Sequence, residues 1–368
     1  MPIHFKCDRD VFLKGLSTAE KAVELRNIKP ILEGVFVQAK DEKIILKATN
    51  LSLSIETAVE GEILEPGEIV VSARIFYDII SKYAPGIIDF YMDDESRLKI
   101  SNHHSKTQLS VMDAAEFPGL PILPESGKII LTQTAFKKML NTTIFSAAIS
   151  DARPILKGVL METENNILKI VALDGYRLAY RKISLSGELP SIKAIIPSSA
   201  FREVIKILDD TDDEISIYLA DNIACIKTKD TKIYMRLLEG EFIKYKNILP
   251  NEYKSKIKLN KNDISNSVER ASVLARSEKD KLVKFNVVDD ILTITSASEL
   301  GEAFEQVDIF LEGKHIDIAF NAKYLSDVFK VIEDDDIILE FNTNVSPCVI
   351  RSGESDDYLY LVLPVQMR

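Results

Sequence analysis

"RPILKGV" at residues 153–159 is nearly identical to "KPILEGV" at residues 29–35, and the two stretches lie 124 residues apart. An internal repeat has to be identified before any motif is considered, because overlooking it leads to the wrong fold for the whole chain. The two stretches therefore predict at least two units of similar structure.

The similarity extends well beyond these two stretches. "VVSARIFYDIISKY" resembles "IIPSSAFREVIKIL", so that Phe76 matches Phe201 at an offset of 125 residues. "SVMDAAEFPGLP" matches "MRLLEGEFIKYKNILP" at the same offset of 125 residues, which aligns Phe117 with Phe242. The nearly constant offset indicates a second complete copy.

A third and fainter copy fills the rest of the chain. "AFNAKYLSDVFKVIEDDDIILEF" follows the segment around Phe201, with Tyr324 lying 123 residues past Phe201, and "LVKFNVVDDILTITSA" follows "ILKGVLMETENNILKIVA". A chain of 368 residues is long enough for two or three domains. We therefore predict three repeated domains, with boundaries at 1–127, 128–254 and 255–368.

Each unit has the pattern of a helix, several strands, a second helix and further strands. Phe12, Leu16, Ala19 and Val23 form one apolar stripe at helical spacing. The second and third units repeat this stripe with Phe136, Leu140 and Ala147, and with Ile264, Val268, Ala271 and Ala275. The predicted helices are 8–26, 72–82, 132–148, 197–208, 260–276 and 321–331.

Four segments, "KIILKAT", "RLKIS", "ISIYLA" and "ILTITS", alternate apolar and polar residues. This alternation is typical of strands in a sheet with one buried and one exposed face. Runs of strands with two helices per unit predict an α+β fold, in which the helices pack on one face of largely antiparallel sheet.

The distribution of charge leaves two interpretations open. The chain carries a net charge of −11, which argues against a uniformly basic nucleic-acid binder. The six helix windows nevertheless hold fifteen Lys or Arg and nine Asp or Glu, a net charge of +6 that leaves −17 on the remainder. These helices either have ordinary solvated faces or form a basic track for phosphates that binds without reading bases.

The sequence contains no signal for a disulfide, a cofactor or a membrane. The cysteines Cys7, Cys225 and Cys348 are far apart, lack the spacing of a zinc site and are expected to be small buried residues. The first residues contain neither a basic n-region nor a long apolar run. We expect a cytoplasmic protein without a cofactor.

The segment "VALDGYRLAYRK" resembles a signature of the bacterial sliding clamp, the beta subunit of DNA polymerase III. It keeps Asp174, Gly175 and Arg177, but has Leu173 where the family has Thr and Tyr176 where it has His. Further matches are "RNIKPIL", "AAEFPGLP", "RPILKGV" and the final "YLVLPVQMR". The resemblance covers the whole chain.

This resemblance implies two chains of three domains each, closed head to tail into a homodimeric ring around duplex DNA. Helices would line the hole and sheets would form the outer wall. Such a clamp is a non-catalytic processivity subunit. Its expected partners are DNA, a second copy of itself, the DNA polymerase III alpha subunit, the clamp loader delta subunit and other proteins with a clamp-binding motif, and no membrane.

The family binds the hydrophobic end of partner peptides in a cleft between domains two and three. Carried over by position, the cleft comprises Leu156, Leu173, Gly175, Tyr176, Arg177, Leu178, Ile243, Asn247, Ile248, Asn321, Tyr324, Val345, Pro347, Leu361, Val362, Leu363, Pro364, Val365, Met367 and Arg368. Aliphatic residues would desolvate a partner Leu or Phe, while Tyr176 and Arg177 would orient the peptide. Ile243, Asn247 and Gln366 depart from the usual family residues, so the preferred peptide should differ in detail.

The resemblance also implies positions for DNA contacts and for ring closure. Arg26, Ser150 and Pro154 match loop positions that contact DNA, and charge on the predicted helices adds Lys137, Lys138, Arg202, Lys206, Lys261, Arg270, Lys323 and Lys330. The residues expected at the dimer interface are Thr107, Leu109, Val273 and Leu274. Thr107 replaces a usual aromatic residue.

Two other classes of function are alternatives to a clamp. The acidic runs at 208–214 and 333–337 suggest an enzyme with clustered carboxylates, but they lack calcium-loop spacing and both follow the second helix of a unit. The adjacent His103 and His104 have no third metal ligand nearby in sequence. A repeat scaffold that binds only proteins would share the cleft and lack the basic track.

Overall fold

The computed structural model describes residues 2–24, 29–92, 97–122, 127–150, 153–220, 222–250, 252–275, 281–353 and 355–366. The chain forms two compact units, each with its own sheets. Unit 1 consists of Met1–Thr134 and Ser199–Leu237, and unit 2 consists of Ala135–Ser198 and Leu238–Arg368. All strand pairs within the described residues are antiparallel, as the alternating sequence patterns predicted.

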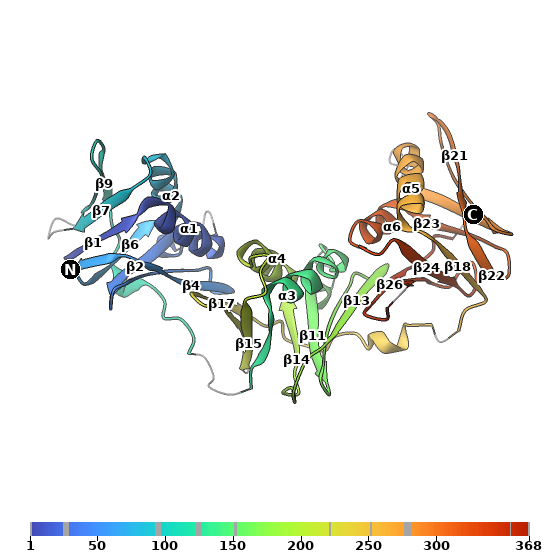
Figure 1. Cartoon of the computed structure of the whole chain (residues 1–368), viewed down its shortest axis with the longest axis horizontal. Coiled ribbons are helices and arrows are strands. Elements are labelled where there is room, and N and C mark those ends of the chain that lie inside the picture. The colour runs from blue at the N-terminus through green and yellow to red at the C-terminus, as the bar shows by residue number, and fades with distance from the viewer. Residues whose placement is uncertain are drawn as a thin grey trace. The chain divides into compact units, whose positions relative to one another are not determined.

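Unit 1 contains two sheets (Figure 1). The smaller sheet has the order β5-β1-β7-β8-β9, with the strands β1 Ile3–Asp8, β5 Glu62–Glu65, β7 Ile87–Met92, β8 Arg97–Ser101 and β9 Lys106–Ser110. The larger has the order β10-β15-β16-β17-β4-β3-β2-β6, with β2 Gly34–Lys40, β3 Lys43–Thr49, β4 Leu53–Glu60, β6 Gly67–Ser72, β10 Ile129–Thr132, β15 Glu214–Ala220, β16 Ile223–Lys227 and β17 Thr231–Arg236. The pairing of β17 with β4 makes one continuous sheet from residues of the first two copies of the repeat.

Unit 2 has the same construction. Its larger sheet has the order β14-β11-β12-β13-β26-β25-β24-β18-β22, with β11 Gly158–Glu164, β12 Ile167–Leu173, β13 Arg177–Ser184, β14 Lys193–Pro197, β18 Ser255–Asn260, β22 Phe310–Gly313, β24 Asp336–Phe341, β25 Cys348–Ser352 and β26 Tyr358–Val362. The other has the order β21-β20-β19-β23, with β19 Leu282–Val288, β20 Ile291–Ser298, β21 Gly301–Asp308 and β23 Ile316–Asn321. Here the pairing of β13 with β26 joins the second and third copies (Figure 1).

Six α-helices occur among the described residues, one in each predicted window: α1 Arg9–Ala19, α2 Ala73–Lys82, α3 Gln133–Asn141, α4 Ser198–Ile207, α5 Lys261–Ala275 and α6 Ala322–Phe329. The windows 8–26 and 132–148 were too long. α1 gives way to the 3₁₀ turn η1 Glu20–Ala22, after which Val23 is extended. α3 ends before Thr142 and Thr143, whose hydroxyls donate to the carbonyls of Lys138 and Met139, at 2.7 Å each, and side-chain bonds of this kind weaken a helix.

The repeated stretches at 29–35 and 153–159 each form a 3₁₀ turn followed by a strand. In both copies Pro is the first residue of the turn, η2 Pro30–Glu33 and η5 Pro154–Lys157, where its fixed φ and missing N–H are tolerated. Gly34 and Gly158 then begin β2 and β11. The repeated sequence therefore encodes a turn that leads directly into the strand next to the edge of the larger sheet.

Glycine is required at these strand starts because a side chain has no room there. A Cβ on Gly158 would lie 2.4 Å from Ile195 Cγ2 and 2.8 Å from Leu238 Cδ1. A Cβ on Gly34 would lie 2.4 Å from Val70 Cγ1. The backbone φ is extended in both cases, −96° at Gly34 and −90° at Gly158, so close packing of the neighbouring strand and not backbone freedom explains the glycine.

The third copy has leucine in place of glycine at the start of this strand. Leu282 pairs with Asn321, the residue before α6, just as Gly158 pairs with Pro197, the residue before α4. Leu282 thus occupies the place of the glycine, and β19 starts there without a preceding 3₁₀ helix in the described part of the chain. Among the described residues, the third copy therefore shows neither the 3₁₀ turn nor the glycine at the strand start.

We expect Gly158→Ala to lower the free energy of unfolding by about 1–3 kcal/mol, because the added methyl group overpacks the contact with Ile195. Gly34→Ala should behave in the same way. Gly119→Ala is the matched control, since nothing lies within 4 Å of the position that its Cβ would occupy and its φ is not positive. Chemical denaturation of the three variants measures the difference, and equal stability of Gly158→Ala and Gly119→Ala would contradict the packing argument.

Candidate partner-binding cleft

The pairing of β13 with β26 brings together two segments that lie far apart in sequence. Arg177 pairs with Val362 and Leu178 with Leu361. Beyond the strand end, Leu363 N donates to the carbonyl of Tyr176 at 2.8 Å. The segment from Leu173 to Leu178 and the C-terminal segment from Leu361 onward, both predicted for the cleft, therefore lie side by side.

Apolar side chains from both segments form one cluster. Leu156, Leu173, Leu178 and Leu361 each have an exposed fraction of 2%. Ile243 and Leu363 are partly buried and pack against the same cluster. The structure thus assembles six of the predicted cleft residues around one apolar floor, on which a partner's hydrophobic side chain could be desolvated.

A tight turn connects β12 to β13 at the edge of this floor. Asp174 Oδ1 accepts hydrogen bonds from the backbone N–H groups of Tyr176 at 2.9 Å and Arg177 at 3.0 Å. Gly175 has a φ of +95°, which glycine adopts at little cost. Asp174 therefore holds the turn through these two hydrogen bonds.

Arg177 is the centre of the polar contacts beneath the cleft. Its guanidinium donates to Asp174 Oδ2 at 3.0 Å, to Asp327 Oδ2 at 2.7 Å and to the carbonyl of Phe145 at 2.9 Å. It also lies 4.8 Å from the centre of the Tyr324 ring. The residue is only 7% exposed, so its guanidinium is held mainly by these neighbours.

Asp327 is a supporting residue that the sequence did not reveal. Burial opposes ionisation of its carboxyl group, but hydrogen bonds from Arg177 and Lys323 outweigh this effect and hold the pKa of Asp327 below its ordinary value. Its position one turn after Lys323 on α6 was visible in the sequence. Its contact with Arg177, 150 residues away, was not.

Two tyrosines stack on each other at the edge of the site. The rings of Tyr176 and Tyr324 are stacked, with centroids 6.0 Å apart and an interplanar angle of 21°. Tyr176 is 61% exposed. A flat aromatic pair at the rim of an apolar floor offers contact area with little loss of side-chain freedom.

The 3₁₀ turn η6 Tyr245–Asn247 supplies one wall. Tyr245 is buried, and its hydroxyl donates to Glu162 Oε1 at 2.7 Å. Burial and this hydrogen bond raise the pKa of Tyr245 well above its ordinary value. Because Tyr245 anchors the turn, the neighbouring Ile243 packs on the floor while Asn247 and Ile248 remain exposed.

The remaining cleft residues have different degrees of exposure. Asn321 caps α6, with Oδ1 accepting from Lys323 N at 2.9 Å, and Val345 is 61% exposed. Val362 is fully buried and Val365 N donates to the carbonyl of Ala319 at 2.8 Å. Pro347 and Pro364 are partly buried. Met367 and Arg368 lie outside the described residues.

The helices keep the basic excess that the sequence indicated. Within their observed bounds they carry eleven Lys or Arg and six Asp or Glu, a net charge of +5. Four of the candidate DNA contacts form ion pairs: Lys138 with Glu333, Lys206 with Glu203, Arg270 with Glu305 and Lys323 with Asp327. Such exposed pairs contribute at most about 1 kcal/mol, so phosphates could compete for the cations.

The other candidate DNA contacts differ in their exposure to solvent. Arg202 and Lys330 are exposed, and Lys137 and Lys261 are partly exposed. Ser150 is exposed, and Pro154 is the first residue of η5. Arg26 lies outside the residues that the structure describes.

The candidate dimer contacts fall on two elements. Thr107 and Leu109 lie on β9, an edge strand of its sheet, and Thr107 Oγ1 is 3.0 Å from the hydroxyl of Tyr83. Val273 and Leu274 lie near the end of α5, where Val273 is 60% exposed. α5 packs on β21, another edge strand, which carries Phe304 with 66% of its surface exposed. Alternation along β21 could have revealed Phe304 from the sequence.

The remaining candidates for other chemistry are the acidic residues, the cysteines and the pair His103 and His104. No group of three or more His, Cys, Asp or Glu residues is placed to hold a metal ion in the described ranges. Cys7, Cys225 and Cys348 are buried, and burial raises the pKa of Cys7 and of Cys225 to about 12. His103 and His104 are exposed between β8 and β9. None of the helices among the described residues is sufficiently long and apolar to span a bilayer.

Three family models match successive parts of the chain. Residues 3–121 match the N-terminal domain of the DNA polymerase III beta subunit, residues 130–244 its central domain and residues 246–366 its C-terminal domain. The beta sliding clamp of Staphylococcus epidermidis is 31% identical over 374 residues, which cover 99% of both chains.

Solved structures give the same result. The DNA polymerase sliding clamp of Bacillus subtilis is 29% identical, with a TM-score of 0.97 and complete coverage of both chains. A sliding clamp from Pseudomonas aeruginosa, bound to griselimycin, is 26% identical, with a TM-score of 0.94 over 100% of both chains. With its three repeated domains, antiparallel sheets and matching sequence over the full length, this chain belongs to the DNA polymerase III beta subunit family, the beta sliding clamps.

Proposed function

We propose that two copies of this chain close head to tail into a ring around duplex DNA and tether the replicative polymerase and other replication proteins. The membership of the family is the observation that carries this function. The chain itself is a non-catalytic subunit that makes its partners processive. A closed ring keeps its partner on DNA by topology, so its contacts with the duplex can stay weak and independent of sequence.

The exposed sheet edges support ring closure. β9 in unit 1 and β21 in unit 2 each lie at the end of a sheet order, with main-chain groups available for pairing. Leu109 on one edge and Val273 and Phe304 at the other offer apolar side chains. We propose that these two edges of different copies meet, which forms two identical interfaces in a dimer related by two-fold symmetry.

The helices support the DNA contact. A net charge of +5 on the helices, within a chain of net charge −11, concentrates positive charge on one class of element. Lysine and arginine contacts to phosphate bind by release of counterions and carry no base specificity. We propose that Arg26, Ser150 and Pro154 and the basic helix residues face the duplex. The place of action would be the cytoplasm, where bacterial DNA is replicated.

The apolar floor supports the tethering role. Leu173, Leu178 and Leu361 are buried below a rim with the exposed Tyr176 and Val345, an arrangement suited to a peptide with a hydrophobic end. We propose that the alpha subunit of the polymerase and the delta subunit of the clamp loader bind here in turn, together with other clamp-binding proteins. The domain boundaries at 1–127, 128–254 and 255–368 remain part of this proposal.

The ring predicts retention on DNA whose ends are blocked. The protein is first incubated with linear duplex that carries biotin at both ends, and streptavidin is then added to cap them. Threaded rings should co-elute with capped DNA at about 0.15 M salt and be lost when a restriction enzyme opens the duplex internally. Equal loss from capped and uncapped DNA would exclude topological retention.

The proposed edges can be tested with Leu109→Asp and Val273→Asp. A carboxylate buried between two apolar surfaces is costly, so both variants should elute as monomers of 41.4 kDa and lose retention on capped DNA. Light scattering after gel filtration measures the mass. Phe310→Asp is the control, because Phe310 is exposed on β22 of the other sheet in unit 2. A dimer in both edge variants would contradict the proposed interface.

The aromatic rim predicts a specific contribution to peptide binding. Tyr176→Ala should weaken the binding of a fluorescent peptide with Leu and Phe at its hydrophobic end by about tenfold, or ~1.4 kcal/mol. Tyr176→His should retain most of the affinity, because a planar ring can still stack on Tyr324. Fluorescence anisotropy measures the affinities. Undiminished binding by Tyr176→Ala would remove this residue from the cleft.

The support beneath the cleft predicts a pH-dependent stability. The folded-state pKa of Asp327 lies below its unfolded value, so its contribution is present above about pH 4 and is lost as the pH falls through the folded-state pKa. Asp327→Asn should therefore reduce the free energy of unfolding by about 1–3 kcal/mol between pH 5 and 8, with a smaller difference below pH 4. Asp356→Asn, which breaks an exposed pair with Lys182, should cost much less. A pH-independent difference for Asp327→Asn would contradict this interpretation.

A further inference from the structure

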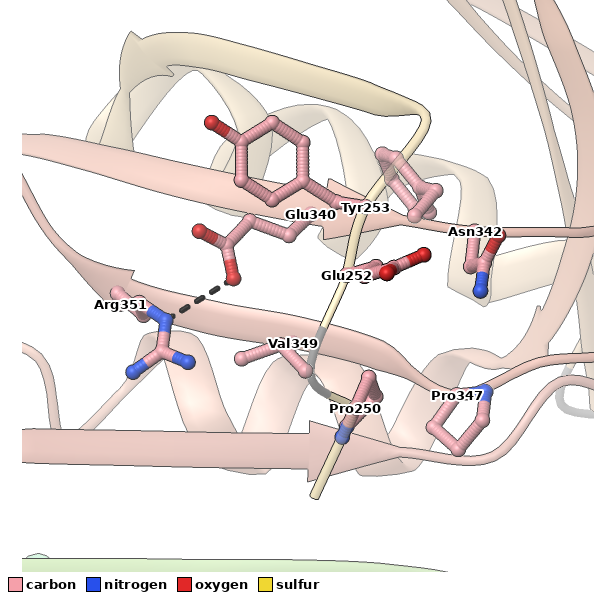
Figure 2. A pocket seen from close by; sticks show the side chains of 9 residues that line it. Pro250, Glu252, Tyr253, Glu340, Asn342, Pro347, Val349 and Arg351 are labelled. Carbon is pink, nitrogen blue, oxygen red and sulfur yellow. Dashed lines mark hydrogen bonds and ion pairs between the residues drawn. The ribbon is translucent and has the colours of Figure 1, made fainter.

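A surface pocket lies one strand away from the cleft. It is formed where the connecting segment at Pro250, Glu252 and Tyr253 passes over β24 and β25 (Figure 2). The full lining is Pro250, Glu252, Tyr253, Glu340, Phe341, Asn342, Pro347, Val349 and Arg351. All of these residues belong to unit 2.

The pocket shares its floor with the cleft. Val349 lines the pocket and also belongs to the apolar cluster beneath the cleft, where it pairs directly with Leu361 across β25 and β26. Pro347 is both a pocket residue and a predicted cleft residue. Neighbouring strands lie about 4.8 Å apart and an extended peptide advances about 3.3 Å per residue. A peptide seated in the cleft therefore reaches the pocket with one to three further residues.

The polar groups of the pocket favour a cation. Glu340 Oε2 accepts from Arg351 Nε at 2.9 Å, so this carboxylate is neutralised, as the dashed line in Figure 2 indicates. Glu252 is exposed and forms no ion pair with any described residue. Glu252, Glu340 and Arg351 together give the pocket lining a net charge of −1. Apolar walls of Pro250, Pro347 and Val349 suit the methylene stem of a long basic side chain.

The side chain of Asn342 gives a second and independent indication that the pocket binds a hydrogen-bond donor. Its Oδ1 is buried and has no hydrogen-bond partner among the described residues. A buried acceptor without a partner is unfavourable, and native structures contain few such atoms. A donor that enters the pocket beside Asn342 could satisfy this group after a small rotation of the amide.

We propose that this pocket is a second recognition site for partner peptides, which takes the cationic side chain of an arginine or lysine one to three residues from the hydrophobic end. The inference rests on the proposed tethering function of the cleft. Glu252 would attract the cation and Asn342 would accept a hydrogen bond from it. Arg351 would neutralise Glu340, so that Glu252 carries the net negative charge. Partners would then be ranked by this flanking residue as well as by their hydrophobic end.

The test uses the full chain and a set of synthetic fluorescent peptides. All carry Leu and Phe at the hydrophobic end, and arginine, alanine or glutamate is placed in turn at each of the three adjacent positions. Arginine at one position should raise the affinity about three- to tenfold over alanine, and glutamate there should lower it. Equal gains at all three positions, or no gain, would overturn the proposal.

Two variants distinguish binding of arginine in the pocket from a general electrostatic attraction between a basic peptide and an acidic protein. Glu252→Gln should reduce the ratio of arginine-peptide to alanine-peptide affinity to less than about twofold. Glu188→Gln is the matched control, since Glu188 is an exposed carboxylate outside the pocket, and it should leave the ratio unchanged. A ratio that persists in Glu252→Gln would contradict the assignment.

A second measurement tests the pocket without relying on peptide binding in the cleft. N-acetyl-arginine methylamide is titrated into protein with labelled valine methyl groups, and the Val349 signals should shift in the wild type and shift less in Glu252→Gln. If the alanine peptide fails to bind, the proposed function of the cleft is wrong. The Val349 shifts still show whether the pocket binds the arginine side chain. Unshifted Val349 signals would overturn the pocket proposal even if every peptide binds the cleft.

Discussion

The pairing of β13 with β26 is the interaction on which the candidate site depends. It joins residues 177–181 to residues 358–362 through main-chain hydrogen bonds and so merges two copies of the repeat into one nine-stranded sheet. Main-chain pairing sets the register of every side chain on both strands. A shift by one residue would turn Leu178 and Leu361 away from the apolar floor, and the cleft would lose its base.

Arg177 connects this sheet to the helices and loops around it. Its guanidinium contacts Asp174 in the turn, Asp327 on α6 and the carbonyl of Phe145. A buried cation is tolerated because all these groups satisfy it, and removal of one partner leaves the charge uncompensated. The Tyr324 ring lies 4.8 Å from the same guanidinium and stacks on Tyr176.

The three copies of the repeat differ at the start of the first strand after the first helix. Gly34 and Gly158 keep the 3₁₀ turn and the tight strand start, whereas Leu282 replaces them in the third copy. In the second copy the residue Leu156, within the turn, is also part of the apolar floor. The same stretch thus serves both the strand start and the apolar cluster. Unit 2 adds the pocket at Glu252 and Asn342, which the repeat pattern did not predict.

The sequence by itself determined the repeat, the α+β fold, the order of helices and strands and the family, because periodicity and turn residues are local properties. It overestimated α1 and α3, since the stripe continued through Val23 and Ala147 beyond the helix ends. Only the tertiary structure decided that Arg177 is buried, that Asp327 supports it and that a pocket adjoins the cleft. These features depend on strand register and on contacts between residues as far as 150 positions apart, which no local pattern encodes.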